Sequence, residues 1–341
     1  QESCPVNPSS DRKLSRRGLL HSGVVLASSS LLAATNVQAQ GTFPSRPIKV
    51  IIGTPPGDTA DGWIRILAEM MARSLGQPVV VENKPGAHWV IAAGLAKAAA
   101  PDGYTLLAGT GGPMAVNPAL YRGKLSYDPQ KDFTPIAPVL SGALFLYCRQ
   151  DLPVQNLRDM IAWVKERPGL VSYGSGGTGT TQHLSMELLK AATGLQMTHV
   201  PYRGSPMVLT DVIGGQIPFA FDAGGSLLPH VKAGRVRVIG VTGTQRDPSL
   251  PDAPTLAEQG VSGINSRVWM GMFAPANTPS EIVARLGDVI NRVATTQEFA
   301  SRLTASASVP WIGRSNDLRQ FLVSDTEAWS RVVEQGNIKP E

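Results

Sequence analysis

Glycine- and threonine-rich turns are the part of this sequence best suited to binding a ligand. They follow predicted strands and begin predicted helices, where backbone N–H groups have no partner inside the helix and the helix dipole adds partial positive charge. Carboxylates bind at such helix starts without a cationic side chain. The turns cover residues 54–61, 82–89, 109–112 and 173–183. Together they predict a site for a small anion.

Helix dipoles alone would not bind that anion tightly. Each helix start contributes about 0.3–1 kcal/mol, whereas a micromolar ligand needs about 8 kcal/mol. Direct hydrogen bonds from Ser175, Thr178 and Thr180, and exclusion of water from the site, would have to supply the rest.

Motifs for catalysis, nucleotides and metals are missing from the sequence. There is no G-x-x-x-x-G-K-[ST] phosphate loop, and Tyr173 stands where a G-x-S-x-G motif around Ser175 would need glycine. Residues 174–179 satisfy G-x-G-x-x-G, but the next predicted strand does not end in an acidic residue, which disfavours a dinucleotide. The histidines are scattered along the chain. We therefore predict no enzyme activity, no catalytic residues, no cofactor and no metal site.

The first 39 residues have the three parts of an export signal. A basic cluster at 12–17 precedes a weakly apolar stretch at 18–34, and Val37-Gln38-Ala39 fits a cleavage site. Ser15-Arg16-Arg17 also fits the twin-arginine pattern, so the general and twin-arginine routes both stay open. We expect export to the periplasm with cleavage near Ala39, which would leave Cys148 as the single cysteine of the mature chain.

The elements behind the turns predict an α/β fold with two lobes. Short β-branched runs alternate with longer amphipathic runs, as in mostly parallel sheets. Strands are predicted at 46–53, 79–82, 104–109 and 136–149, a second alternating set at 157–242, and a helical layer at 280–335. The predicted first lobe is discontinuous, with residues 42–143 plus 264–341, and residues 144–263 form an inserted second lobe. The two crossings between lobes would make a hinge beside an interlobe cleft.

Charge and hydropathy narrow the class of partner. The net charge of +5 falls to a mild +3 without the leader, which carries four basic and two acidic residues. No Lys/Arg-rich run or basic-aromatic pattern is present, so nucleic acid is a poor partner. Beyond the leader, no apolar run approaches the length of a membrane span.

Several separate segments resemble one known family. They are FPSRPIKVII (43–52), GQPVVVENKPGA (76–87), APDGYTLLAGT (100–110), NPALY (117–121), YDPQKDFTPIAPV (127–139), YGSGGTGTTQHL (173–184), HVPYRG (199–204) and APTLAEQG (253–260). From Phe43 onward the chain resembles the periplasmic solute receptors of tripartite tricarboxylate transporters, also called Bug receptors. The resemblance implies a two-lobed, type II periplasmic-binding-protein-like fold. It also implies a monomer that closes on a small carboxylate and delivers it to membrane permease subunits.

The resemblance also implies which residues bind the ligand. Family members hold the ligand carboxylate mainly through backbone amides and hydroxyls. The matching positions here are Gly57, Thr59 and Thr110 in the first lobe and Ser175, Thr178, Gly179 and Thr180 in the second. Asp222 matches a position that faces the cleft and helps to sort ligands by their distal group, although it could equally cap the following helix.

Two cleft turns depart from the family pattern and extend the predicted site to Asp58, Ala87, His88 and Trp89. Asp58 replaces the second glycine of P-P-G-G, and residues 86–90 read Gly-Ala-His-Trp-Val where relatives usually read G-A-G-G-N. We expect Trp89 or His88 to pack against a ring or hydrocarbon body, which favours an aromatic or bulky acid. Asp58 should repel an anion unless it is paired or turned outward, so a ligand with an amine stays open.

Two other function classes stay open from the sequence. A ligand-sensing subunit for a membrane signalling protein would have the same sequence features, and partner capture would separate it from a transport receptor. An exported hydrolase could use Ser175 with His183, but would need an aligned base and an oxyanion hole. We expect His183 to be a hydrogen-bonded structural residue.

Overall fold

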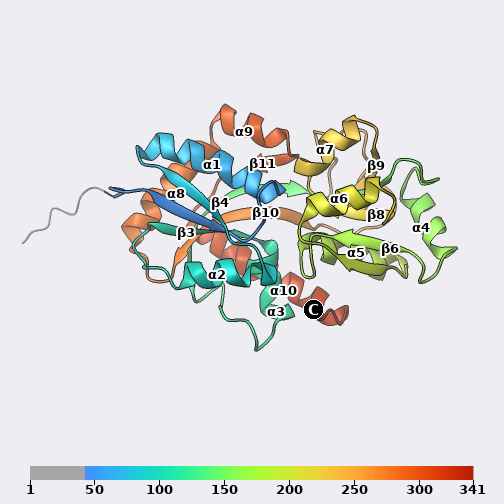
Figure 1. Cartoon of the computed structure of the whole chain (residues 1–341), viewed down its shortest axis with the longest axis horizontal. Coiled ribbons are helices and arrows are strands. Elements are labelled where there is room, and N and C mark those ends of the chain that lie inside the picture. Colours follow the sequence, from blue (N-terminus) through green and yellow to red (C-terminus); the bar gives the residue numbers. More distant parts are fainter. Residues whose placement is uncertain (1–42, 341) are drawn as a thin grey trace, which may run out of the picture. The chain divides into compact units, whose positions relative to one another are not determined.

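The computed structural model describes residues 43–340, so the predicted export signal lies outside the described residues. From Pro44 onward the chain forms one compact unit. Two mixed sheets with helices packed on them form two lobes in this unit, which confirms the predicted α/β two-lobed fold (Figure 1).

The first sheet has the strand order β11-β4-β10-β3-β1-β2. Its strands are β1 (Ile48–Ile52), β2 (Val79–Asn83), β3 (Thr105–Thr110), β4 (Phe133–Ala143), β10 (Arg267–Pro275) and β11 (Ser308–Pro310). Strands β1, β2 and β3 run parallel, and β10 pairs antiparallel with both β3 and β4. The near-continuous apolar run of β1 suits a strand that is covered on both faces.

The second sheet has the order β7-β6-β8-β5-β9. Its strands are β5 (Phe145–Arg149), β6 (Ser172–Ser175), β7 (Thr198–Pro201), β8 (Phe219–Asp222) and β9 (Val236–Val241). Strand β6 is parallel to β7 and β8, whereas β5 is antiparallel to β8 and β9. All the strands of this sheet lie between the two segments that build the first sheet.

The chain crosses between the sheets at two places that are hydrogen-bonded to each other. The first crossing is Leu144 alone, between β4 and β5, and the second follows β9. The Thr242 N–H donates to the Leu144 carbonyl at 2.9 Å, and the Leu144 N–H donates to Thr242 Oγ1 at 2.9 Å. The prediction of one strand over 136–149 is therefore wrong, because β4 and β5 belong to different sheets.

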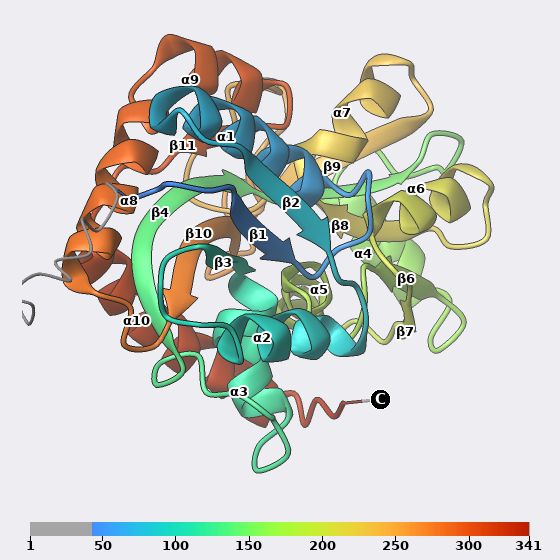
Figure 2. The same cartoon turned by 60° about the vertical axis from the view of Figure 1, so that its left-hand side comes forward.

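Helices cover both faces of the first sheet (Figure 2). Helices α1 (Thr59–Leu75), α8 (Ser280–Ala294) and α9 (Gln297–Thr304) pack together on one face, and α2 (Val90–Lys97), α3 (Asn117–Leu120) and α10 (Ser315–Gln335) lie on the other. The second sheet carries α4 (Leu157–Lys165), α5 (Thr181–Thr193), α6 (Ser205–Ile213) and α7 (Gly224–Lys232). The short strand β11 lies inside the predicted carboxyl-terminal helical layer and was not predicted.

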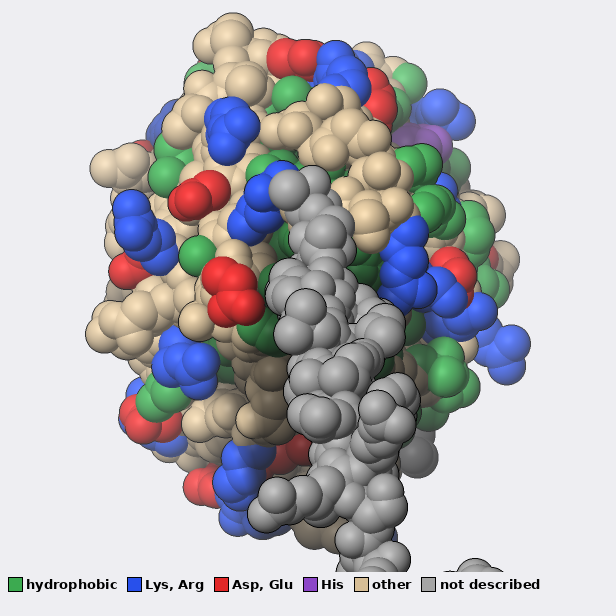
Figure 3. All heavy atoms as spheres, turned by 90° about the vertical axis from the view of Figure 1, so that its left-hand side faces the viewer, with side chains coloured by type: hydrophobic (Ala, Val, Ile, Leu, Met, Phe, Trp, Pro, Cys, Tyr) green, Lys and Arg blue, Asp and Glu red, His purple; other side chains and the backbone are tan. Residues whose placement is uncertain are grey.

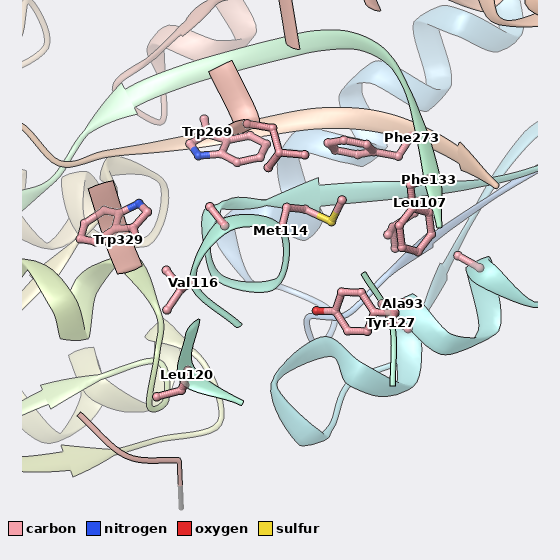
Figure 4. Packing of buried hydrophobic residues seen from close by; sticks show 14 of the residues in the cluster. Ala93, Leu107, Met114, Val116, Leu120, Tyr127, Phe133, Trp269, Phe273 and Trp329 are labelled. Atoms are coloured by element: carbon pink, nitrogen blue, oxygen red, sulfur yellow. The ribbon is translucent and has the colours of Figure 1, made fainter. Parts of the chain in front are cut away.

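Aromatic side chains fill the core of the first lobe (Figure 4). Trp269 and Phe273 of β10 pack in one buried cluster with Leu107 of β3 and with Met114. Trp269 is 1% exposed, and its indole N–H donates to Asp325 Oδ2 of α10 at 2.8 Å. This bond satisfies the polar atom of a buried tryptophan, so the ring can form part of the rigid floor beneath the interlobe turns.

Within residues 43–340, no helix is long and apolar enough to cross a membrane. Figure 3 shows one face of the molecule, on which Lys and Arg side chains are interspersed with Asp and Glu. Arg73 and Glu298 are one close pair of opposite charges among the described residues, at 2.6 Å.

Candidate functional site

A cavity of about 670 Å³ opens where the strand ends of the two lobes meet. Residues after the carboxyl ends of β1, β2, β3, β6, β7 and β8 line it, together with Val268 and Trp269 of β10. This is where ligands bind in open α/β sheets, because strand-to-helix turns gather there. The location agrees with the glycine-rich turns that the sequence singled out.

The structure brings most of the predicted site residues to this cavity. The predicted residues in its lining are Asp58, Thr59, Ala87, His88, Trp89, Thr110, Thr178, Gly179, Thr180 and Asp222. Gly57 and Ser175 are not part of the lining. The Gly57 N–H donates to Asp61 Oδ2 at 3.0 Å, and the fully buried Ser175 hydroxyl donates to the Gly177 carbonyl at 3.0 Å. Both residues therefore shape turns rather than face the cavity.

The second-lobe loop 176–180 is held by its own hydrogen bonds. The Gly177 carbonyl accepts from the Thr180 N–H at 3.2 Å and from Thr180 Oγ1 at 2.8 Å. Thr180 Oγ1 also accepts from the His183 N–H, which caps α5. The Gly179 N–H donates to His183 Nδ1 at 3.1 Å, so that amide is directed into the lobe. The hydroxyl of Thr180 and the amide of Gly179 thus fix the loop whose other atoms border the cavity.

A stack of aromatic rings supports this loop from behind. His183 and His199 lie 3.9 Å apart with 14° between their planes, and Tyr173 stacks on His199 at 5.1 Å. Because His183 Nδ1 accepts a hydrogen bond, the neutral ring carries its proton on Nε2, which lies 4.0 Å from Glu187 Oε1. Burial lowers the pKa of His183 to about 4, with further lowering by Lys190 and His88. His183 is therefore a neutral structural residue at physiological pH.

Ser175 has a basic partner, but the pair does not form a hydrolase site. Its Oγ lies 2.7 Å from His199 Nε2 and not against His183. The serine is fully buried and lies outside the cavity lining, so a substrate in the cavity would not reach its hydroxyl. Among residues 43–340, no group of three or more His, Cys, Asp and Glu could hold a metal ion.

Asp61 organises the first-lobe turn, and the sequence analysis missed it. Its carboxylate is 3% exposed and accepts from Gly57 N–H, from Arg65 Nε at 3.0 Å and from Asn83 Nδ2 at 2.8 Å. Burial alone would raise its pKa, but these hydrogen bonds, led by Arg65 and Asn83, outweigh burial and lower it. The i,i+4 spacing of Asp61 and Arg65 was the available signal.

The turn at 87–89 has an unusual backbone. Ala87, His88 and Trp89 have φ angles of 43°, 48° and 71°, in the left-handed region that favours glycine. The Trp89 ring lies against the Gly53 backbone, because a Cβ added to Gly53 would lie 2.4 Å from the ring. His88 reaches the second lobe, since a Cβ added to Gly177 would lie 3.1 Å from His88 Cε1. His88 therefore occupies space between the lobes, whereas Trp89 packs on the first lobe at the border of the cavity.

Asp222 lies at the end of β8 and is 1% exposed. Its carboxylate accepts from the Ala223 N–H at 2.8 Å and from Ser226 Oγ at 2.6 Å, at the start of α7. Burial raises its pKa to about 6 against the opposing effect of hydrogen bonds from Ser226 and Ser205, and Asp58 raises it further. The side chain thus borders the cavity and fixes the start of α7 through Ala223 and Ser226, but it does not cap that helix, whose N-cap residue is Ala223.

Comparison with known proteins decides the family. Residues 63–338 match the family described as "Tripartite tricarboxylate transporter family receptor". This chain belongs to that family. The tricarboxylate transporter receptors are periplasmic solute-binding proteins rather than enzymes, and the Bug receptors are among them, which confirms the resemblance found in the sequence.

Solved structures of similar receptors share the fold over their whole length. The structure of R. palustris Rpa4515 with adipate is 32% identical with a TM-score of 0.84, and covers 88% of this chain and 100% of that one. The structure of periplasmic binding protein BugD is 28% identical with a TM-score of 0.82, and covers 88% of this chain and 100% of that one. MatC from Rhodopseudomonas palustris with bound malate is 31% identical with a TM-score of 0.79, and covers 85% of this chain and 100% of that one. This chain is therefore similar to receptors whose structures hold dicarboxylates.

Proposed function

We propose that this protein is an exported receptor that captures a small carboxylate between its lobes and delivers it to the membrane permease subunits of a tripartite tricarboxylate-type transporter. The cavity carries the proposal, because glycine-rich turns from both sheets converge on it without a catalytic constellation in its lining. Adipate in Rpa4515 and malate in MatC support a carboxylate as the ligand class.

The proposal includes lobes of residues 42–143 plus 264–341 and of residues 144–263. Sheet membership of the strands supports this division within the described residues. Leu144 and Thr242 would form the hinge, because their mutual hydrogen bonds join the two crossing strands at one place. Closure about this hinge would bring loop 176–180 toward the first-lobe turns and exclude water from the ligand.

Thermal unfolding of the chain from residue 40 should identify the ligand class. We expect stabilisation by one group of carboxylates in a panel of aliphatic dicarboxylates, aromatic acids and amino acids. A ligand at 100 times its dissociation constant should contribute about 2.7 kcal/mol. Neutral amide analogues of the same acids are the matched controls. Equal midpoints with every acid and every amide, for a well-folded protein, would overturn the carboxylate proposal.

Trp89 should bias the choice toward acids with a ring or bulky body. Its indole borders the cavity and is fixed against Gly53, so it offers a preformed apolar surface. In Trp89→Gly, the affinity for benzoate relative to adipate should fall about 2- to 13-fold, which corresponds to about 0.5–1.5 kcal/mol of aromatic stacking. Calorimetric titration of both acids measures the ratio. An unchanged ratio would remove Trp89 from the specificity site.

A further inference from the structure

The carboxylate of Asp58 lies between the amino ends of two helices that belong to different sheets. In the first lobe, Asp58 caps α1, and its Oδ1 accepts from the Ala60 N–H at 3.0 Å. On the other side, Asp58 Oδ2 would lie 3.4 Å from a Cβ added to Gly204, the residue before α6. The Ser205 N–H at the start of α6 donates to the same carboxylate. One side chain therefore joins the two lobes across the cavity.

The amino end of α6 has few other donors to offer a ligand. Gly204 has no side chain with which to cap the helix, and Pro206 in its first turn has no N–H. The Ser205 hydroxyl donates to Asp222, while its N–H donates to Asp58. Two carboxylates of the protein thus occupy both donors of Ser205.

Two carboxyl groups of the protein lie at this end of the cavity. Asp58 and Asp222 both belong to the lining and interact electrostatically with each other. Within the described lining, Arg203 is the single Lys or Arg and His88 is the single histidine. A second carboxylate on a ligand would enter a region that already holds two carboxyl groups and would find the α6 amide occupied. Like charges brought together at an interface oppose binding strongly.

We propose that Asp58 acts as a built-in carboxylate that bridges the lobes at α6 and excludes the distal carboxylate of a ligand, so that this receptor selects monocarboxylates with a neutral or cationic distal end. The inference rests on the proposed function and narrows its ligand class. It sets this chain apart from relatives whose structures hold adipate and malate.

Three six-carbon acids test the selectivity, because they differ only at the distal end. Adipate carries a carboxylate there, hexanoate a methyl group and 6-aminohexanoate an ammonium group. The wild type should bind hexanoate or 6-aminohexanoate at least about ten-fold more tightly than adipate. In Asp58→Asn, which retains an oxygen that can cap α1, this preference should shrink about ten-fold. Asp288→Asn changes the net charge equally on α8, outside the cavity lining, and should leave the preference unchanged.

The outcomes separate this inference from the proposed function. Adipate bound as tightly as the two monocarboxylates, with the same ratios in Asp58→Asn, would overturn the selectivity while leaving a carboxylate receptor. Failure of all carboxylates in the wider panel to bind would overturn the proposed function and the selectivity with it. Small-angle scattering without ligand tests the bridge independently. Asp58→Gly should have a larger radius of gyration than the wild type, and equal radii would overturn the bridging role.

Discussion

His183→Gln should make the protein less sensitive to acid than the wild type. Between pH 6.5 and 4, the unfolding free energy of the variant should fall by about 3 kcal/mol less than that of the wild type. The wild-type ring is 4% exposed and stacked on His199, and its Nδ1 accepts the Gly179 N–H. A proton on Nδ1 would remove that acceptor and place a buried charge near Lys190. Glutamine can still accept a hydrogen bond but does not titrate.

The direction of the pH effect follows from the lowered pKa. In the unfolded chain His183 takes up a proton below about pH 6.5, whereas in the folded protein its pKa is about 4. The stability that comes from the neutral ring is complete above pH 6.5 and is lost as the pH falls toward 4. Asp222 and Asp325 have the opposite effect on stability, because burial raises the pKa of each carboxyl group to about 6. Their contribution to stability therefore increases as the pH falls. Both stay in the variant, so the difference between the two proteins isolates His183.

Urea unfolding at several pH values between 7.5 and 4 measures this difference. His230→Gln is the matched control, because that half-buried histidine on α7 lies outside the ring stack and its pKa is lowered less. The control should follow the wild-type profile much more closely than His183→Gln does. Parallel profiles for wild type and His183→Gln would contradict the assignment of His183 as the buried neutral group.

The location of the site could be predicted because it depends on local chain chemistry. Glycine and threonine turns after β-branched runs had to meet at one edge of each sheet, and the cavity lies there. The split between β4 and β5 could not be seen in the same way. Leu140 and residues 144–148 are buried, and the half-buried Ser-Gly-Ala at 141–143 interrupts the apolar run only briefly where the chain changes sheets.

Individual roles inside the site depended on contacts between distant segments. The sequence placed Ser175 and Gly179 among the ligand-binding groups, but His199 and His183, from β7 and α5, engage the Ser175 hydroxyl and the Gly179 N–H. Likewise, the bulk of Trp89 was evident, but its position against Gly53 was not. Hydrogen-bond partners supplied by other elements decide which of several suitable groups faces the ligand.

Asp58 and His88, at the two turns that depart from the family pattern, both affect how the two lobes meet. Both belong to first-lobe turns, and both contact second-lobe glycines, Gly204 and Gly177 respectively. Glycine at these two positions leaves room for the side chains, and φ angles of +114° and +132° disfavour any other residue there. The departures therefore change how the lobes meet as well as the surface that a ligand would contact.

Gly177→Ala should weaken carboxylate binding by more than about ten-fold and destabilise the protein by about 1–3 kcal/mol. The φ of +132° strains any side chain, and the new Cβ would lie 3.1 Å from His88 Cε1 and 3.4 Å from the Tyr202 carbonyl oxygen. The Gly177 carbonyl also holds the Ser175 and Thr180 hydroxyls, so movement of this residue would release the loop.

Gly169→Ala separates the loss of the binding loop from the general cost of replacing a left-handed glycine. Gly169 has a φ of +74° and lies outside the cavity lining. A Cβ added to Gly169 would have no other atom within 4 Å. It should lose about 1 kcal/mol of stability and keep the wild-type affinity. Urea unfolding and calorimetric titration of both variants measure the two effects. Wild-type affinity in Gly177→Ala would show that loop 176–180 does not hold the carboxylate, because the loop cannot keep its geometry around an alanine at that φ.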